Sequence, residues 1–278
     1  MNRVSTYIRQ SLQNHYSPQE VKSLTMMICC DMLGYEAIDV YMGKDLILSE
    51  SKQRELENIL IRMRKNEPIQ YVLGVATFCG MPFGVAPGVL IPRPETEELV
   101  ERIVAENPGS PRILDMGTGS GCIAIALSRK LPEAEVVAWD ISDDALAIAQ
   151  RNNAALQTTV TFEKQDILTC QPNAESVFDV LVSNPPYVTE SEKKEMDAHV
   201  LDWEPSLALF VPDDDPLRFY RRIACLGHKL LKGNGKLYFE INRAYGDETA
   251  QMLKESGYHH VCVVKDLFGN NRIVTAYR

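Results

Sequence analysis

The sequence contains no apolar run that approaches the roughly 20 residues needed to cross a lipid bilayer. Its first residues lack the apolar core of a secretory signal, so we expect a cytoplasmic protein without a membrane anchor. None of its seven cysteines belongs to a Cys-x-x-Cys motif, and no histidine stands near a cysteine at zinc-ligand spacing. We therefore expect reduced thiols and no metal site. The five histidines form no recognisable catalytic set.

Positive charge is also scarce in this chain. It has 29 lysine and arginine residues against 38 aspartate and glutamate residues, which gives a net charge of −9. Proteins that bind duplex nucleic acids normally present a basic face to the phosphates, so this balance argues against a direct nucleic-acid substrate. With 278 residues the chain exceeds the usual size of one domain, and we expect about two. We also expect a monomer.

Residues 1–70 are predicted to form a small helical bundle. Ser17–Glu20 makes a capping box with proline at the first helical position, and an apolar stripe from Leu56 to Met63 has helical spacing. We assign this bundle to substrate recognition, although simple packing would produce the same pattern. Residues 71–92 contain β-prone runs on both sides of a turn at Cys79–Pro82, which predicts a β-hairpin linker.

Residues 93–278 alternate between strand and helix patterns. This alternation predicts a Rossmann-like α/β domain, with a mostly parallel sheet and helices on both faces. The final two strands leave no room for a crossover helix, so they are predicted to form an antiparallel hairpin at the sheet edge. A turn is predicted at Gly233–Gly235. The seven predicted strands are Ile113–Met116, Val136–Trp139, Val160–Phe162, Val177–Val182, Lys236–Ile241, Val261–Lys265 and Arg272–Tyr277.

A glycine-rich turn follows the first strand of this predicted domain. Gly117, Gly119 and Gly121 let the backbone turn sharply and approach a ligand, and the next helix directs its N-terminus at the bound group. A dinucleotide fingerprint would place its third glycine one position later. With Asp115, the pattern D-x-G-x-G-x-G resembles motif I of S-adenosylmethionine-dependent methyltransferases. An NAD site and a purely structural turn are the alternatives.

Acidic residues after the next two strands suit a nucleoside. Asp140 ends the second strand at the carboxyl edge of the sheet, where its carboxylate can accept hydrogen bonds from both ribose hydroxyls. NAD enzymes place an acid similarly, so Asp140 indicates nucleoside binding more than methyl transfer. A capping role before Ser142 is the alternative. Asp166 is a candidate for the adenine amino group, with Ile167 beside the ring.

The segment Asn184-Pro185-Pro186-Tyr187 follows the fourth predicted strand. Pro185 holds Asn184 in an extended geometry, and neither proline has an N–H group that would compete for the site. The Asn184 side-chain oxygen and the Pro185 carbonyl can each accept one hydrogen from a substrate NH2 group, while Tyr187 can lie flat on it. Two fixed acceptors orient a poorly nucleophilic amide nitrogen and stabilise its developing positive charge. We therefore predict methyl transfer to a planar nitrogen, with Asn184, Pro185 and Tyr187 as catalytic residues.

Several segments together resemble the HemK-type release factor glutamine methyltransferases. The resemblance covers the chain from about residue 66 to the C-terminus, and the helical N-terminal part fits in position and size. Its motifs are Gln70-Tyr71-x-Leu73-Gly74, Ile91–Glu97, the glycine-rich turn, Asn184–Tyr187, Glu204-Pro205-x-x-Ala208-Leu209 and Asp266-Leu267-x-Gly269-x-x-Arg272. The resemblance implies a seven-stranded class I S-adenosylmethionine methyltransferase domain. It also implies N5-methylation of the glutamine in the Gly-Gly-Gln loop of peptide chain release factors.

The resemblance also implies site residues. It places the cofactor on Gly117, Thr118, Gly119, Ser120, Gly121, Asp140 and Asn184, and the sequence patterns described above add Asp115, Asp166 and Ile167 as expected cofactor contacts. The expected contacts of the glutamine amide are Asn184, Pro185, Pro186 and Tyr187. Arg93 and Glu95 lie in a family segment near that pocket, where they either contact the substrate or form part of the linker and the start of a helix.

The sequence departs from the family pattern in two loops. Val211–Pro216 lacks the usual glycine, and no glycine follows the acid in Glu240–Asn242. Neither departure touches the motifs that carry the chemistry. The mixed-charge segment Glu190–Asp197 predicts an exposed helix beside the Asn184 loop, where it could act as a flap.

Several other functions use the same motifs. An adenine-N6 DNA methyltransferase can hold its NH2 group with the same four residues, but it would have to flip the base out of the duplex, and the acidic charge disfavours it. Methylation of a different protein glutamine or of a small molecule is a second alternative. A NAD-binding oxidoreductase and a non-catalytic binding protein belong to different classes, and the Asn184 loop argues against both.

Overall fold

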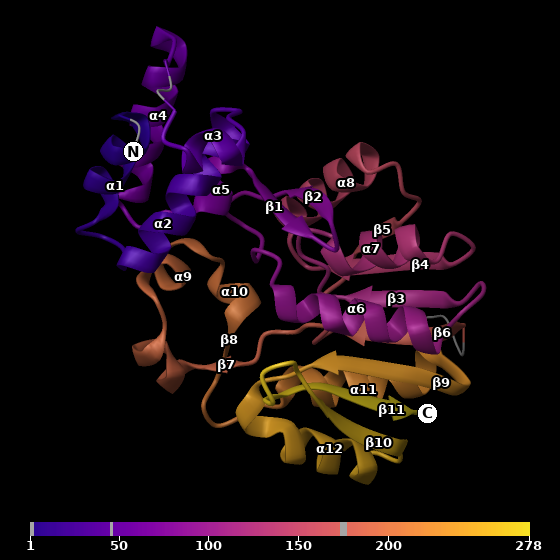
Figure 1. Ribbon diagram of the computed structural model, residues 1–278. Helices are drawn as coiled ribbons and strands as arrows, with labels where there is room; N and C mark the ends of the chain where they lie inside the picture. The colour runs from indigo at the N-terminus through magenta and orange to yellow at the C-terminus, as the bar shows by residue number, and fades with distance from the viewer. Residues whose placement is uncertain (1–2, 45–46, 173–176) are drawn as a thin grey trace. The chain divides into compact units, whose positions relative to one another are not determined.

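The computed structural model describes residues 3–44, 47–172 and 177–278 (Figure 1). The chain divides into two compact units. The first comprises residues 1–74 with residues 197–203, and the second comprises residues 75–196 with residues 204–278. Among the helices that the structure describes, none combines the length and apolar character that a bilayer-spanning segment needs.

The first unit is helical. Its helices are α1 (Arg3–Leu12), α2 (Pro18–Met27), η1 (Ile28–Met32, a π-helical turn), α3 (Ala37–Tyr41), α4 (Glu50–Met63), α5 (Ile69–Leu73) and α9 (Ala198–Trp203). The predicted capping box is confirmed, because Ser17 Oγ accepts from the Glu20 N–H and the Glu20 carboxylate accepts from the Ser17 N–H. Fully buried side chains such as Ile8, Leu12 and Leu60 form the core of this unit.

The second unit contains the predicted seven-stranded sheet. Its strand order is β10-β11-β9-β6-β3-β4-β5 (Figure 1). The strands are β3 (Arg112–Met116), β4 (Glu135–Asp140), β5 (Thr161–Lys164), β6 (Phe178–Ser183), β9 (Leu231–Glu240), β10 (His259–Lys265) and β11 (Asn271–Tyr277). Strands β5, β4, β3, β6 and β9 run parallel, while β11 is antiparallel to both β9 and β10. The predicted antiparallel hairpin at the sheet edge is therefore confirmed.

Helices cover both faces of this sheet. The helices of the unit are α6 (Pro94–Glu106), α7 (Cys122–Lys130), α8 (Asp143–Ala155), α10 (Ser206–Leu209), α11 (Arg218–Leu230) and α12 (Gly246–Glu255), with 3-10 turns η2 (Glu190–Glu195) and η3 (Arg243–Tyr245). Of these, α6 and α7 pack on one face of the sheet, and α11 and α12 pack on the other. Leu114, Leu181 and Leu237 share a core with α11 and α12, whereas the neighbouring Ile113 and Val180 share a core with α6 and α7. Burial on both faces explains the continuous apolar runs of these strands.

The hairpin has a tighter turn than the sequence predicted. Its strands β1 (Val75–Phe78) and β2 (Met81–Gly84) pair in antiparallel register. Only Cys79 and Gly80 connect them, and both have left-handed backbone angles, which matches the favoured twist of a two-residue hairpin. Two further strands, β7 (Val188–Thr189) and β8 (Phe210–Val211), form a short parallel pair that the sequence did not predict.

One other prediction needs correction. Gly233–Gly235 does not precede a strand but lies inside β9, as an irregularity in its pairing with β6. The partner of Phe178 is Leu231 and the partner of Val180 is Lys236, so four residues of β9 bulge out opposite a single residue of β6. The predicted exposed helix in the mixed-charge segment is present as a 3-10 helix at Glu190–Glu195, and none of its residues is buried.

The Tyr258 ring packs closely against α11 at Gly227. A Cβ atom on Gly227 would lie 2.1 Å from the Tyr258 hydroxyl, which is buried and donates to the Ala224 carbonyl at 2.9 Å. Gly227→Ala should therefore displace the ring and lower the unfolding free energy by about 1–3 kcal/mol in urea titrations. Gly233→Ala is the matched control, because no described residue has an atom within 4 Å of its Cβ position. Equal stability of the two variants would contradict this packing.

Candidate active site

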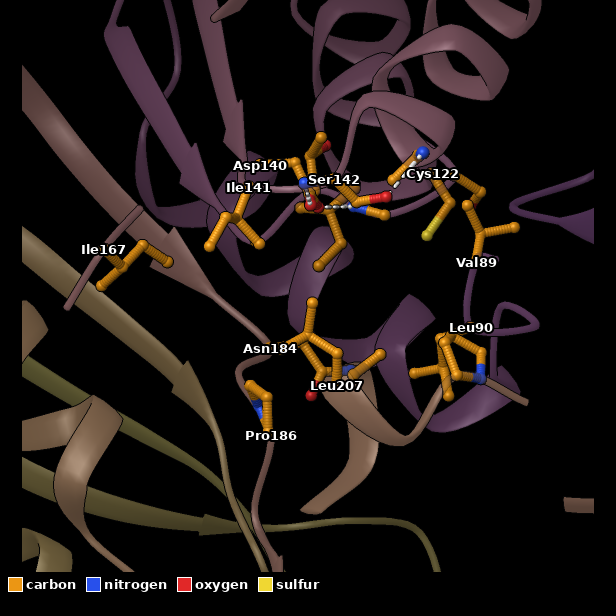
Figure 2. A pocket seen from close by; sticks show the side chains of 18 of the residues that line it. Val89, Leu90, Cys122, Asp140, Ile141, Ser142, Ile167, Asn184, Pro186 and Leu207 are labelled. Carbon is orange, nitrogen blue, oxygen red and sulfur yellow. Dashed lines mark hydrogen bonds between the residues drawn. The ribbon is translucent and has the colours of Figure 1, made fainter. Parts of the chain in front are cut away.

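A cavity of about 340 Å³ opens at the carboxyl edge of the sheet in the second unit (Figure 2). This size falls in the usual range of ligand pockets, and open α/β sheets bind ligands at this edge. Its walls come from the loops after β3, β4, β5 and β6, the loop before α6, α10 and the start of α11. The predicted site residues that line it are Arg93, Gly117, Thr118, Gly119, Ser120, Asp140, Asp166, Ile167, Asn184 and Pro186.

The glycine-rich turn forms one wall. Gly117, Gly119 and Gly121 have φ values of +81°, +56° and +82°, a region that disfavours side chains. A Cβ on Gly121 would lie 2.9 Å from Ile125 Cδ1, whereas nothing lies within 4 Å of the Cβ position on Gly119. Gly121 therefore lets the turn pack on its helix, while Gly119 leaves the backbone open to a ligand.

Three strand ends are tied together around this turn. The N–H groups of Gly117 and Thr118 both donate to the Trp139 carbonyl, at 2.9 and 3.0 Å. The Ser183 hydroxyl donates to the Met116 carbonyl at 2.6 Å. These bonds hold the ends of β6, β3 and β4 at one level, so the Asn184 loop and the glycine turn face the same cavity.

Asp115 lies beneath the turn and not in the cavity wall. Its Oδ2 atom accepts from the Thr118 hydroxyl at 2.6 Å, and its Oδ1 atom has no hydrogen-bond partner among the described residues. Complete burial raises the pKa of this carboxyl to about 7; the Thr118 hydrogen bond opposes the rise and the nearby Asp140 charge adds to it. Asp115 thus anchors the glycine-rich turn through Thr118, although burial of its carboxyl disfavours the charged form.

Asp140 projects into the cavity from the end of β4 (Figure 2). Its Oδ2 atom accepts from the Gly119 N–H at 2.8 Å, and its Oδ1 atom accepts from the Ser142 N–H at 2.9 Å. Burial raises the pKa of Asp140, while these N–H groups and that of Ile141 oppose the rise. Each oxygen keeps capacity for a further donor, which suits the two adjacent hydroxyls of a ribose. Ser142 is also the N-cap of α8, where its hydroxyl oxygen accepts from the Ala145 N–H at 3.2 Å.

Asp166 and Ile167 form the side of the cavity beyond β5. Asp166 is fixed by the Leu168 N–H at 2.9 Å and the Thr169 hydroxyl at 2.8 Å. Ile167 is buried against the turn, since a Cβ on Gly117 would lie 4.0 Å from its Cδ1 atom. A flat apolar group can lie on Ile167 with polar edges toward Asp166.

The Asn184 loop is divided between the cavity and the interior. Asn184 and Pro186 line the cavity, but Pro185 and Tyr187 do not (Figure 2). Pro185 is buried, and the Tyr187 hydroxyl donates to Glu240 Oε1 at 3.3 Å. Burial and the Glu240 charge both raise the pKa of Tyr187. The tyrosine ring therefore supports the loop from within.

Two segments from the family pattern meet at Glu204. This buried carboxylate forms an ion pair with Arg93, which lines the cavity, and accepts from the Ile91 N–H at 3.0 Å. It thereby fixes the loop before α6 to the start of α10. Glu95 does not line the cavity; it lies in the first turn of α6, and its charge raises the pKa of Glu240.

Sequence reasoning missed many wall residues. They are Gly88, Val89, Leu90, Pro92, Thr96, Cys122, Ile123, Ile141, Ser142, Ala145, Gln165, Leu168, Pro205, Leu207, Ala208 and Phe219. Leu207 and Ala208 stand in the Glu204–Leu209 motif, which could have located them. Val89 and Leu90 carry no motif, so only the fold brings them to the site. Within the described part of the chain, no cluster of three or more metal-ligating side chains occurs.

Comparison with known proteins identifies the family. A release factor glutamine methyltransferase from Bacteroides thetaiotaomicron is 64% identical over 278 residues, covering 100% of both chains. The chain belongs to the release factor glutamine methyltransferase family. A second member, from Flavobacterium psychrophilum, is 43% identical over 274 residues and covers 97% of this chain and 96% of its own. The resemblance found in the sequence is therefore confirmed.

Domain models and a solved structure agree with this family. The PrmC N-terminal domain matches residues 4–74, and the methyltransferase small domain matches residues 94–201. A methyltransferase from Pyrococcus furiosus aligns with a TM-score of 0.54 at 17% identity, covering 80% of this chain and 98% of its own. This likeness shows the α/β fold, and with the family model match it confirms the predicted methyltransferase domain.

Buried Asp115 gives the site a pH signature. Because its folded pKa of about 7 lies above the ordinary value of 3.8, the folded state gains a proton and stability from this group as pH falls through 7. Asp115→Asn removes this dependence. Between pH 8.5 and pH 5.5 the unfolding free energy of wild type should rise on the order of 2 kcal/mol more than that of the variant, as measured by urea titrations at both pH values. A difference that stays constant over this range would contradict the assignment.

Proposed function

We propose that the protein transfers a methyl group from S-adenosylmethionine to the side-chain amide nitrogen, N5, of the glutamine in the Gly-Gly-Gln loop of peptide chain release factors. Membership of the family supports this function. The observation that carries it is the shared cavity, in which Asn184 faces the glycine-rich turn and Asp140. A nucleoside cofactor and a planar NH2 group would thus meet in one enclosed space.

The cavity residues fit S-adenosylmethionine. Asp140 would accept from the ribose hydroxyls, Asp166 from the adenine amino group, and Ile167 would contact the ring. The open backbone at Gly119, with Thr118 and Ser120 beside it, would approach the remainder of the cofactor. When bound, the cofactor supplies an electrophilic methyl group on a positively charged sulfur.

Asn184 and Pro185 would hold the acceptor. An amide nitrogen is a weak nucleophile because its lone pair is delocalised into the carbonyl group. The Asn184 Oδ1 atom and the Pro185 carbonyl would each accept one of its hydrogens and favour the positive charge that develops in the transition state. Such fixed acceptors also align the nitrogen with the methyl carbon. No strong base is needed, since the methylated nitrogen becomes acidic and releases a proton to solvent.

The remaining residues of the loop support this arrangement. Pro186 lines the cavity beside Asn184, and Arg93 forms part of the wall through its ion pair with Glu204. Tyr187 was expected to stack on the acceptor, but its hydroxyl is turned to Glu240, so we assign it to holding the loop. Glu95 is half-buried in the first turn of α6 and does not line the cavity, so we assign it to the start of this helix rather than to substrate contact.

The helical N-terminal unit completes the proposal. We assign residues 1–70 to recognition of the release factor, because a protein substrate offers more surface than its acceptor loop. Exposed apolar side chains on this unit, such as Ile38, Tyr41 and Met42, are available for such contacts. The protein would act as a monomer in the cytoplasm, where release factors work.

Methylation of a purified release factor tests the function. The protein, the release factor and labelled S-adenosylmethionine are incubated together, and the products are mapped by peptide mass spectrometry. One methyl group should appear on the peptide with the Gly-Gly-Gln loop, and none when that glutamine is replaced by glutamate. Label on duplex DNA, or on a different residue of the release factor, would contradict the proposal.

Removal of the Asn184 carboxamide should separate chemistry from binding. Asn184→Ala loses a transition-state acceptor, so its kcat for release factor methylation should fall by roughly 10²-fold or more. The matched control is Gln251→Ala, which also removes a side-chain carboxamide but at an exposed position of α12 outside the cavity, and its kcat should equal that of wild type. An Asn184→Ala enzyme with undiminished kcat would remove Asn184 from the catalytic role.

A further inference from the structure

A buried polar cluster lies directly beneath the Asn184 loop. The Thr96 hydroxyl, on α6, donates to Glu240 Oε2 at 2.7 Å, and the Tyr187 hydroxyl donates to Glu240 Oε1 at 3.3 Å. Asn184 Nδ2 lies 3.5 Å from Thr96 Oγ1, within hydrogen-bond reach. Thr96 and Glu240 are only 2% and 1% exposed, so water does not reach these groups freely.

The hydroxyl of Thr96 has only one proton to donate, and this determines which end of the Asn184 carboxamide can face it. A carboxylate only accepts hydrogen bonds, so the single proton of Thr96 is committed to Glu240. The Thr96 oxygen can then only accept, which means that the group facing it must be a donor. Of the two ends of the Asn184 carboxamide, only the NH2 end can donate. The Oδ1 end is therefore turned away from Thr96.

We propose that Thr96 and Glu240 are positioning residues that fix which end of the Asn184 carboxamide faces the methyl acceptor. This inference rests on the proposed function, since it concerns how Asn184 Oδ1 is presented to the glutamine amide. Thr96 itself lines the cavity beside Asn184. Glu240 touches no ligand and acts only through Thr96 and Tyr187.

In this arrangement both oxygens of Glu240 are acceptors, one from the Thr96 hydroxyl and one from the Tyr187 hydroxyl. Burial raises the pKa of Glu240, while the Thr96 hydrogen bond and the positive charge of Arg272 oppose that rise; the Glu95 charge adds to it. Arg272 is held in place by Asp266, with both guanidinium contacts at 3.2 Å. The Asp266–Arg272 motif of the final hairpin thus supports the same loop from the other side.

Loss of the Thr96 hydroxyl should act on catalysis more than on binding. Without it the carboxamide of Asn184 has no partner on this side and can turn over. Its NH2 end would then face the NH2 group of the acceptor, where two donors meet and neither orients the nitrogen. Contacts that bind the release factor elsewhere on its surface would be unaffected.

The first test observes the carboxamide itself. Protein labelled with 15N-asparagine gives side-chain NH2 signals, and the signal of Asn184 is the one that Asn184→Ala removes. In Thr96→Val, which keeps the shape but loses the hydroxyl, this signal should shift; in Thr96→Ser it should stay as in wild type. An unchanged Asn184 signal in Thr96→Val would overturn the proposal. This measurement requires no methyl transfer.

The second test measures turnover on the release factor. Thr96→Val should lower kcat by about tenfold or more, with KM for the release factor within about threefold of wild type, and Thr96→Ser should restore kcat. Wild-type kcat in Thr96→Val would overturn the proposal. If the wild-type enzyme does not methylate the release factor while the Asn184 signal still depends on Thr96, the proposed function fails and the orienting role stands.

A second variant guards against misfolding of the first. In Glu240→Gln the new NH2 group can donate to Thr96, whose own proton is then free to face Asn184 and reverse the carboxamide. The same shift of the Asn184 signal and the same fall in kcat are expected. Affinity for S-adenosylhomocysteine and the thermal unfolding midpoint of each variant show whether the fold is retained. A folded Glu240→Gln enzyme with the wild-type signal and kcat would contradict the inference.

Discussion

The hydrogen bond from the Ser183 hydroxyl to the Met116 carbonyl joins the carboxyl ends of β6 and β3, so that the two strands end side by side. Because β3 and β6 are parallel neighbours, the loops that leave them emerge at the same edge. One loop is the glycine-rich turn and the other begins with Asn184. The site depends on this register. If β6 shifted by one residue along β3, the Asn184 loop would no longer lie opposite the glycine-rich turn, and the side chains of β6 would point to the opposite face of the sheet.

Buried carboxyl groups around this edge show how the fold accommodates charge near a reactive centre. Asp140 is satisfied by two backbone N–H groups, and Glu240 by two hydroxyls. Asp115 has one hydroxyl partner, and its pKa rises to about 7. Perturbed acids of this kind gather at functional sites, where a polar interior has a use that offsets its cost. Each of these acids therefore orders a neighbouring loop rather than acting alone.

Much of the architecture could be predicted because its signals are local. Left-handed backbone angles at Gly117 and Gly121 favour glycine, and a helix, α7, begins directly after the turn, so the turn and the helix that follows it were predicted correctly. The short connection between β10 and β11 excludes a crossover helix. The irregularity at Gly233–Gly235 was missed because a bulge is defined by the partner strand, which the local sequence does not show.

The support of the site could not be predicted from sequence because it is made of distant pairs. Thr96 and Glu240 are 144 residues apart, and neither belongs to a motif with an evident chemical role. Val89 and Leu90 reach the cavity only through the loop before α6. The hydrogen bond from the Tyr187 hydroxyl to Glu240 is another such distant pair, and the expected contact of the Tyr187 ring with the acceptor stays a prediction. Motifs identified the residues near the chemistry, and tertiary packing decided which of them face it.

A crystal structure of the protein with S-adenosylhomocysteine and a glutamine peptide would test the central claim most directly. The account predicts that the glutamine nitrogen lies within hydrogen-bond distance of Asn184 Oδ1 and of the Pro185 carbonyl, and points at the sulfur. It also predicts the ribose hydroxyls on Asp140. A glutamine bound away from the Asn184 loop, or a loop turned away from the nucleoside, would contradict it.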